Sequence, residues 1–228
     1  IPLILKQAKL ILCNSMSTAN DLHAFYQIPR HKLFPIKLGF NNTSYYPLKR
    51  NRKKFFLIIG RHNPHKNLER VIRAFLFAKI NNYKLIFVGP FDRRYTPRLI
   101  KIIEKLNLSH LCEWKGWIDD DEKLLLLNEC HCLIIASLWE GFGLPALEAM
   151  ACGTPIIASA RGALPEVVGE YAYLINPFDI KSIATAMNAV INDTRCFEKA
   201  LNEGPKRAAS FNWTETARSI EQIIDQSC

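Results

Sequence analysis

Six short apolar runs divide the middle of the chain, and each has the length of a buried β-strand. They cover residues 55–60, 84–89, 111–115, 132–137, 155–159 and 171–175. Amphipathic segments of helical length lie between them, and this alternation is typical of parallel strands joined by crossover helices. We therefore expect an α/β fold built on a Rossmann-like, doubly wound parallel sheet.

The two ends of the chain follow a different pattern. Residues 8–26 read as one strand and one helix, and the following stretch reads as a connection between two domains. Residues 211–225 form an amphipathic helical pattern. Because the sequence begins at Ile1 rather than at methionine, we expect it to be part of a longer protein. We predict three parts: the incomplete end of an N-terminal domain with its linker (1–54), the sheet domain (55–210) and a C-terminal helix (211–228).

Charge is concentrated in the first of these parts. Of the 228 residues, 49% are hydrophobic, which is enough to bury a sizeable core, and the net charge is +9. Residues 1–54 hold ten Lys and Arg against the single acid Asp21, whereas the remainder is balanced. The run at 48–54, LKRNRKK, suits contact with an anionic membrane or a phosphorylated lipid acceptor, and a solvated linker is the alternative.

Composition also argues against several classes of protein. The sheet domain is neutral and has no helix-turn-helix, zinc-finger or RNA-binding signature, so we expect no nucleic-acid partner. Seven cysteines without framework spacing suit buried thiols in a reducing compartment. The sequence has neither an apolar run of membrane-spanning length nor a secretory signal. These features predict a cytoplasmic protein that at most touches the inner face of a membrane.

A glycine turn after the run at 132–137 carries the first candidate chemistry. Gly141 and Gly143 let the backbone turn tightly and approach a ligand, and the helix predicted to follow begins with amides that suit a phosphate. Glu140 precedes the turn, and we expect Glu148 in the first helical turn. Ionised carboxylates there can accept hydrogen bonds from ribose or hexose hydroxyls. The alternative is that the glycines serve the turn alone and that Glu148 only complements the helix dipole.

A basic loop after the run at 55–60 carries a second group of candidate residues. Arg61 and Lys66 lie five positions apart, and Asn67 is placed to cap the next helix. Two fixed cations and a helix N-terminus can neutralise a leaving diphosphate without a metal ion. A solvated basic loop is the alternative. His62 and His65, between the cations, could donate to a ligand or cap the helix.

The segment EGFGLPALE, followed by AMACGTPIIAS, resembles the signature of the retaining glycosyltransferases of family 4, the group 1 family. The resemblance extends from about residue 8 to about residue 224. It implies the C-terminal, donor-binding half of a GT-B fold, preceded by the tail of an acceptor domain. It also implies a catalytic set and a donor-binding set of residues. The catalytic set comprises Arg61, Lys66 and Glu140. The donor-binding set comprises Gly141, Phe142, Gly143, Leu144, Glu148 and Trp117.

Within that resemblance each group has a role. Arg61 and Lys66 hold the donor diphosphate, Glu140 lies beside the transferred sugar, and Glu148 binds the ribose. Backbone amides of the glycine turn contact sugar and phosphates. Trp117 stands where the family places the wall of the base pocket, although a core position is the alternative.

The implied reaction transfers a hexose from a nucleotide-diphosphate sugar to a glycan or lipid-linked acceptor, with retention and without a metal or other cofactor. A fragment that binds the donor without turnover is one alternative, and a GT-B phosphorylase or epimerase is another. The base, the sugar, the acceptor and the linkage are not specified by these motifs.

Three further motifs have structural explanations. Asp119 lies three residues before Glu122 and predicts a capping box rather than a metal site. Cys130 and Cys132 flank a histidine in a strand-like run, where neighbours point to opposite faces and cannot chelate together. Glu166 is expected to cap or anchor a helix start near the donor, without a catalytic role.

Overall fold

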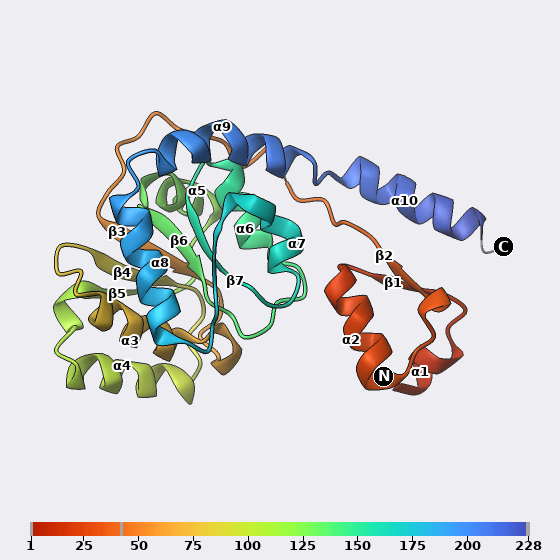
Figure 1. Ribbon diagram of the computed structural model, residues 1–228, viewed down its shortest axis with the longest axis horizontal. Coiled ribbons are helices and arrows are strands. Elements are labelled where there is room, and N and C mark those ends of the chain that lie inside the picture. The colour runs from red at the N-terminus through yellow and green to blue at the C-terminus, as the bar shows by residue number, and fades with distance from the viewer. Residues whose placement is uncertain (1, 42, 227–228) are drawn as a thin grey trace.

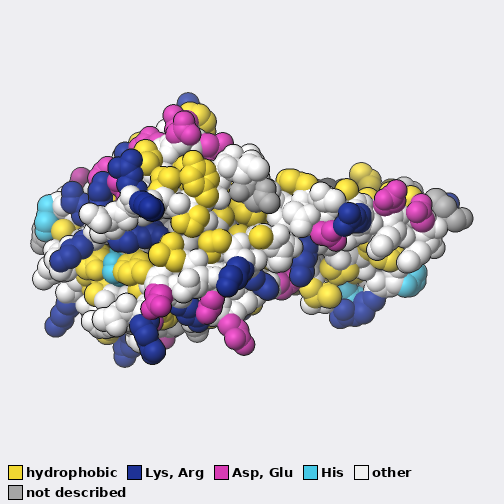
Figure 2. All heavy atoms as spheres, turned by 90° about the horizontal axis from the view of Figure 1, so that it is seen from above, with side chains coloured by type: hydrophobic (Ala, Val, Ile, Leu, Met, Phe, Trp, Pro, Cys, Tyr) yellow, Lys and Arg dark blue, Asp and Glu magenta, His cyan; other side chains and the backbone are white. Residues whose placement is uncertain are grey.

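The computed structural model describes residues 2–41 and 43–226, so Ile1, Asn42, Ser227 and Cys228 of the three predicted parts lie outside it. The chain forms a large part that contains a six-stranded sheet and a small part that contains the N-terminal residues (Figure 1). The space-filling view shows the same two unequal parts (Figure 2).

The large part is built on a parallel sheet with the order β5-β4-β3-β6-β7-β8. Every adjacent pair in it is parallel. The strands are β3 (Phe55–Ile59), β4 (Lys84–Val88), β5 (Cys112–Lys115), β6 (Cys132–Ile135), β7 (Ile156–Ser159) and β8 (Tyr173–Ile175). The strand order reverses between β3 and β6, which makes that boundary the switch point of the sheet. The predicted doubly wound fold and all six of its strands are confirmed.

Helices cover both faces of this sheet, which explains why its strands read as continuous apolar runs. One face carries α3 (Leu68–Ala78), α4 (Tyr95–Lys105) and α8 (Ile180–Asn192). The other carries α5 (Asp120–Glu129), α6 (Leu144–Ala151), α7 (Leu164–Val168) and α9 (Cys196–Ala209). Successive strand residues alternate between the two cores: Phe56 packs with the first set and Leu57 with the second.

The small part is thinner. It contains α1 (Pro2–Gln7), β1 (Ile11–Cys13), α2 (Met16–Tyr26) and β2 (Leu33–Pro35). The two strands pair in parallel and add nothing to the large sheet. Its buried cluster has four members, Cys13, Ala19, Ile28 and Leu33. The predicted strand and helix over residues 8–26 are confirmed.

The predicted C-terminal helix is α10 (Trp213–Asp225), and it crosses from the large part back to the small one (Figure 1). The Thr216 hydroxyl donates to the carbonyl of Lys37 at 2.7 Å. A Cβ on Gly39 would collide with the backbone of Trp213, so the connecting segment passes directly against the start of this helix. Two chain segments therefore join the parts.

The basic run at 48–54 is partly used inside the protein. The Arg52 guanidinium donates to the carbonyl of Leu127 at 2.7 Å and to that of Gly153 at 2.7 Å. These carbonyls belong to the ends of α5 and α6, where backbone acceptors lack intrahelical partners. Lys53 pairs with Glu129 at 2.6 Å. Two cations of the run thus stabilise the fold, and the solvated-linker interpretation is wrong for Arg52.

Within residues 2–41 and 43–226, none of the helices combines the length and the apolar character needed to cross a bilayer. The six described cysteines are free thiols, and five of them are buried. This agrees with the expectation of buried thiols.

Candidate functional site

Most of the candidate residues lie in the two loops that follow the carboxyl ends of β3 and β6, on both sides of the switch point. The loop after β3 contains a short 3-10 turn, Pro64–Lys66, and the loop after β6 leads into α6. The amide of Leu138 donates to the carbonyl of His65 at 2.8 Å, which fastens the two loops together. Ligands of doubly wound sheets bind at this position.

Lys66 and Glu140, from the two loops, form an ion pair. Their side chains are only 17% and 14% exposed. The Ser137 hydroxyl donates to the same carboxylate oxygen, Oε1, at 2.7 Å. The arrangement brings together a cation and an acid that stand 74 positions apart in the sequence.

The loop that carries Glu140 is also held by the loop that follows β7. The amide of Ala163 donates to the Glu140 carbonyl at 2.9 Å. Gly162 has φ +64°, and a Cβ there would lie 2.6 Å from that carbonyl oxygen. Glycine at this position therefore allows the loop after β7 to support the loop after β6.

A second ion pair joins Lys123 of α5 to Glu148 of α6 at 2.8 Å. These side chains are 19% and 13% exposed. Glu148 lies in the second turn of α6, and the prediction that it lies in the first turn is wrong, because the helix already begins at Leu144. The charge beside this carboxylate therefore comes mainly from Lys123 rather than from the helix start.

Glu148 keeps one free acceptor. Lys123 binds its Oε1, whereas its Oε2 is buried and has no hydrogen-bond partner among the described residues. Burial raises the pKa of Glu148, and the hydrogen bond and charge of Lys123 oppose that shift. Burial also disfavours the charged form of Lys123, but the hydrogen bonds and charges of Glu148 and Tyr45 together outweigh it and raise the pKa of the lysine. The pair presents a desolvated oxygen that a ligand hydroxyl can satisfy.

Lys123 was not singled out from the sequence. Its ammonium lies 5.0 Å from the centre of the Tyr45 ring, and the Tyr45 hydroxyl donates to Asp120 at 2.9 Å. Asp119 does cap α5 by accepting from the amide of Glu122 at 2.8 Å, as predicted. That cap fixes the phase of α5, but only the packing of α5 beside α6 shows that Lys123 meets Glu148.

Gly143 is the glycine that the turn requires. It caps α6 with φ +102°, and a Cβ there would lie 2.7 Å from Leu164. Gly141 has no such restriction: its Cβ would lie 3.3 Å from Trp139 and 3.5 Å from Asn14. The turn therefore faces the small part of the molecule at Gly141.

The neighbouring side chains of the turn have different environments. Phe142 is buried and packs against Phe211 with ring centres 6.0 Å apart, so only its backbone is available to a ligand. Leu144 is exposed at the start of α6. Trp117 lies in the loop between β5 and α5 and is 80% exposed, so the core interpretation of this residue is wrong.

Three residues of the loop after β3 have different surroundings. Arg61 is exposed and forms no ion pair with any described residue. His62 is buried, its ring lies 5.0 Å from that of Trp114, and burial lowers its pKa to about 4. It is therefore a neutral, buried residue rather than a helix cap, and its Nε2 has no hydrogen-bond partner among the described residues. His65 is exposed, and burial and the charge of Lys66 lower its pKa.

Asn67 stands at the start of α3, as predicted, but its side chain does not cap that helix. Its amide donates to the carbonyls of Ala136 at 3.0 Å and Pro177 at 2.7 Å. The side chain instead connects the loop after β3 to the segments that follow β6 and β8. The predicted capping role is wrong because these buried carbonyls lie within its reach.

Glu166 anchors a helix start in the small part. Its two carboxylate oxygens accept from the amides of Met16 at 2.9 Å and Ser17 at 2.7 Å. The capped helix is α2, whereas a helix near the donor was expected. Trp139 adds a second connection by donating to Asp21 at 2.7 Å. The segments that flank Glu140 are thus linked to the N-terminal residues.

Within residues 2–41 and 43–226, no three His, Cys, Asp or Glu side chains converge in a metal-binding arrangement. Cys130 and Cys132 are both fully buried. The independence from metal implied by the sequence resemblance stays a prediction.

Comparisons with known proteins give this geometry a context. The profile of the family described as "Glycosyl transferases group 1" matches residues 45–208. MMP alpha-(1->4)-mannosyltransferase of Mycolicibacterium hassiacum is 28% identical over 98% of the chain and 56% of that protein. O-antigen chain mannosyltransferase B of Escherichia coli is 27% identical over 92% of the chain and 58% of that protein.

A solved structure shares the fold. Sucrose-phosphate synthase of Thermosynechococcus elongatus superimposes with a TM-score of 0.87 and 26% identity over 99% of the chain. That match covers 60% of the solved chain. The chain thus spans little more than half the length of these relatives.

Proposed function

Because the chain belongs to the group 1 glycosyltransferases and has the fold of the C-terminal half of a GT-B enzyme, we propose that its cleft binds a nucleotide-diphosphate sugar. From this donor a hexose passes to a glycan or lipid-linked acceptor with retention at the anomeric carbon. The names of the two mannosyltransferase relatives favour mannose and a polysaccharide product.

The observation that carries this proposal is the Lys123–Glu148 pair. Its buried, unpartnered Oε2 is an acceptor in need of a donor, and an ionised carboxylate can only accept hydrogen bonds. A ribose hydroxyl is a donor of the right kind. The hydrogen bond and charge of Lys123 favour the ionised form of this carboxyl group against the effect of burial, which raises its pKa, and they hold it in one position.

The diphosphate is assigned to the two cations of the loop after β3, Lys66 and Arg61. Lys66 pairs with Glu140 of the loop that leads into α6, and Arg61 precedes it in the same loop after β3 and is exposed. Helix N-termini attract phosphate groups, and fixed cations stabilise the negative charge that builds as a diphosphate leaves. Since the stabilisation is greatest in the transition state, these groups raise the rate rather than only hold the donor.

Glu140 is then placed next to the transferred sugar. In the proposed step the bond from the anomeric carbon to the phosphate oxygen breaks, and the acceptor oxygen bonds to the same face of that carbon. The proton of the acceptor hydroxyl passes to the departing phosphate. Glu140 accepts hydrogen bonds from the sugar and holds Lys66 in place, so no covalent intermediate on a carboxylate is needed.

A second candidate follows from the extent of the chain, which covers 56% of the Mycolicibacterium relative. The small part has a two-stranded sheet and a four-residue core, and it gives the acceptor side of the cleft few residues. The 228-residue chain by itself would then capture a donor without turning it over.

Calorimetry with a panel of nucleoside diphosphate sugars, including the glucose and mannose forms of UDP and GDP, tests the proposal. We expect one or more of them to bind, with affinity lost in Glu148→Gln. A transfer assay on the same sample separates capture from catalysis. If no sugar nucleotide binds, the proposed function is wrong.

A further inference from the structure

The neutral charge of residues 55–228 hides a separation of charge along the sheet. Residues 55–105 hold eleven Lys and Arg against three Asp and Glu, a balance of +8. Residues 106–228 hold nine Lys and Arg against seventeen Asp and Glu, a balance of −8. The basic stretch contains β3, α3, β4 and α4. The molecule therefore has one strongly basic side that its net charge does not reveal.

The cations of this side gather at a groove between α3 and α4. Arg94, Arg98, Lys101 and Lys105 follow one another at spacings of four, three and four residues, which places them on one side of α4. Arg73 of α3 faces them. The groove has a volume of about 530 Å³ and is lined by these five cations together with Glu69, Pro97 and Ile102. It lies outside the donor cleft and shares no residue with it.

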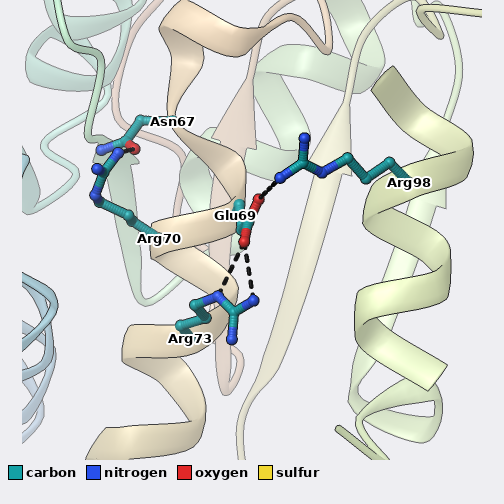
Figure 3. Close-up of polar contacts among 5 residues, drawn as sticks. All are labelled: Asn67, Glu69, Arg70, Arg73 and Arg98. Atoms are coloured by element: carbon teal, nitrogen blue, oxygen red, sulfur yellow. Dashed lines mark hydrogen bonds and ion pairs between the residues drawn. The ribbon is translucent and has the colours of Figure 1, made fainter. Parts of the chain in front are cut away.

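One acid organises part of this array. Figure 3 shows Glu69 between Arg73 of its own helix and Arg98 of α4. Its Oε1 accepts from Arg73 at 2.9 and 3.0 Å, and its Oε2 accepts from Arg98 at 3.1 Å. Because a single carboxylate serves two guanidinium groups, both are positioned while one positive charge remains.

The other three cations are free to meet a partner. Within residues 2–41 and 43–226, Arg94, Lys101 and Lys105 form no ion pair. The opposite side of α4 is committed to the core, since Leu99 and Ile103 are buried. The helix therefore cannot turn an apolar face outward, and any partner of this surface must be recognised by its negative charge.

We propose that the α3–α4 face binds the headgroups of an anionic phospholipid surface. The cations of α4 extend over about 17 Å, at 1.5 Å for each residue, and present separate charges to a plane of phosphates. Lys and Arg near such a surface attract it without inserting. The helices α3 and α4 begin where β3 and β4 end, so the bound face lies beside the donor cleft.

This face is separate from residues 48–54, where a membrane contact was expected and where Arg52 and Lys53 interact within the fold. A nucleic acid fits the face less well. Single strands are bound by aromatic rings on which bases stack, and the groove is lined by no aromatic side chain. The proposal goes beyond the sugar-nucleotide function, because binding to lipid requires neither donor nor turnover.

Sedimentation with vesicles tests the proposal on the 228-residue chain. We expect binding to vesicles of equal parts phosphatidylcholine and phosphatidylglycerol, weakening as salt screens the charges, and none to phosphatidylcholine alone. The variant Arg94→Gln/Lys101→Gln/Lys105→Gln should lower the partition coefficient on the order of 100-fold, about fivefold for each cation. Its donor affinity, measured by calorimetry, should not change.

The matched control removes three exposed cations from the acidic side, Lys181→Gln/Arg195→Gln/Lys206→Gln, and should bind vesicles nearly as well as the parent chain. Equal losses in the two variants would mean that only net charge matters and would overturn the proposal. So would unchanged binding in the first variant. Tighter binding of a single-stranded RNA oligonucleotide, lost in the same variant, would overturn it in favour of nucleic acid.

Discussion

Two regions of the candidate site each contain an ion pair, and the two pairs serve different ends. Lys66–Glu140 connects the loops after β3 and β6, and Lys123–Glu148 connects helices α5 and α6. Both pairs are mostly buried, but Glu140 accepts on one oxygen from Lys66 and Ser137, whereas Glu148 keeps a buried oxygen without a partner. The first pair is built to hold a cation in place, and the second to receive a hydroxyl.

Burial and charge alone therefore do not define the role of an ion pair. An ion pair removed from water contributes little net stability, and its retention requires another reason. In the loop pair that reason is the fixed position of Lys66 in the loop after β3. In the helix pair it is the desolvated acceptor of Glu148, which has no partner among the described residues.

Replacing Lys66 should have the largest effect. Lys66→Ala should lower turnover, measured as release of nucleoside diphosphate, about 100- to 1000-fold, because a fixed charge at the leaving group is lost. Lys84→Ala is the matched control. Lys84 is exposed at the amino end of β4, whereas Lys66 follows the carboxyl end of β3. A rate near that of the parent protein would remove Lys66 from the catalytic set.

Replacing the second acid should affect recognition more than rate. Glu148→Gln should weaken donor binding about 10- to 100-fold, the range for a hydrogen bond to a charged group. The parent chain should discriminate to the same extent against a donor whose ribose lacks its hydroxyls. Titration of both donors into both proteins completes a double-mutant cycle. If the two losses of affinity are additive, Glu148 does not contact the ribose.

The pH dependence of donor affinity should further distinguish the role of Lys123–Glu148 from that of Lys66–Glu140. Glu148 must be ionised to accept, and burial raises its pKa, so affinity should fall on acidification at a higher pH than for an ordinary carboxyl group. Lys123→Met removes the interaction that opposes this shift, and should move the loss to still higher pH. Calorimetric titrations over a pH series give the profile, and an identical acid limb in Glu148→Gln would contradict the assignment.

The smallest effect is expected at the connection to the small part. Glu166→Gln replaces the charge at the start of α2 and should lower stability by about 1 kcal/mol, a typical value for a helix cap. The melting temperature should fall by about 2–4 °C. Glu203→Gln on the exposed side of α9 is the control. No shift relative to that control would show that the contacts with Met16 and Ser17 do not stabilise the arrangement.

The sheet domain could be predicted because its signals are local. Each strand is an apolar run, and Asp119 caps α5 as its spacing from Glu122 indicates. The loops that carry Lys66 and Glu140 were expected at one edge of the sheet, since both follow parallel strands, but their ion pair was not predicted.

What could not be predicted depends on contacts between distant segments. Lys123 and Arg52 looked like surface cations until the packing of α5 against α6 placed them. Asn67 and Glu166 have the chemistry of helix caps, but the sequence did not reveal which partners come within reach. The expectation of Glu148 in the first turn of α6 failed for a local reason, because the helix opens at Leu144.

The central claim is that one sugar nucleotide spans both pairs, with its diphosphate at Lys66 and its ribose at Glu148. The most direct measurement is calorimetric titration of the best-bound sugar nucleotide into the parent chain, Lys66→Ala, Glu148→Gln and the double variant. Each single variant should weaken binding, and the double variant should bind more weakly than either. Binding by the double variant as tight as that of the parent chain would contradict it.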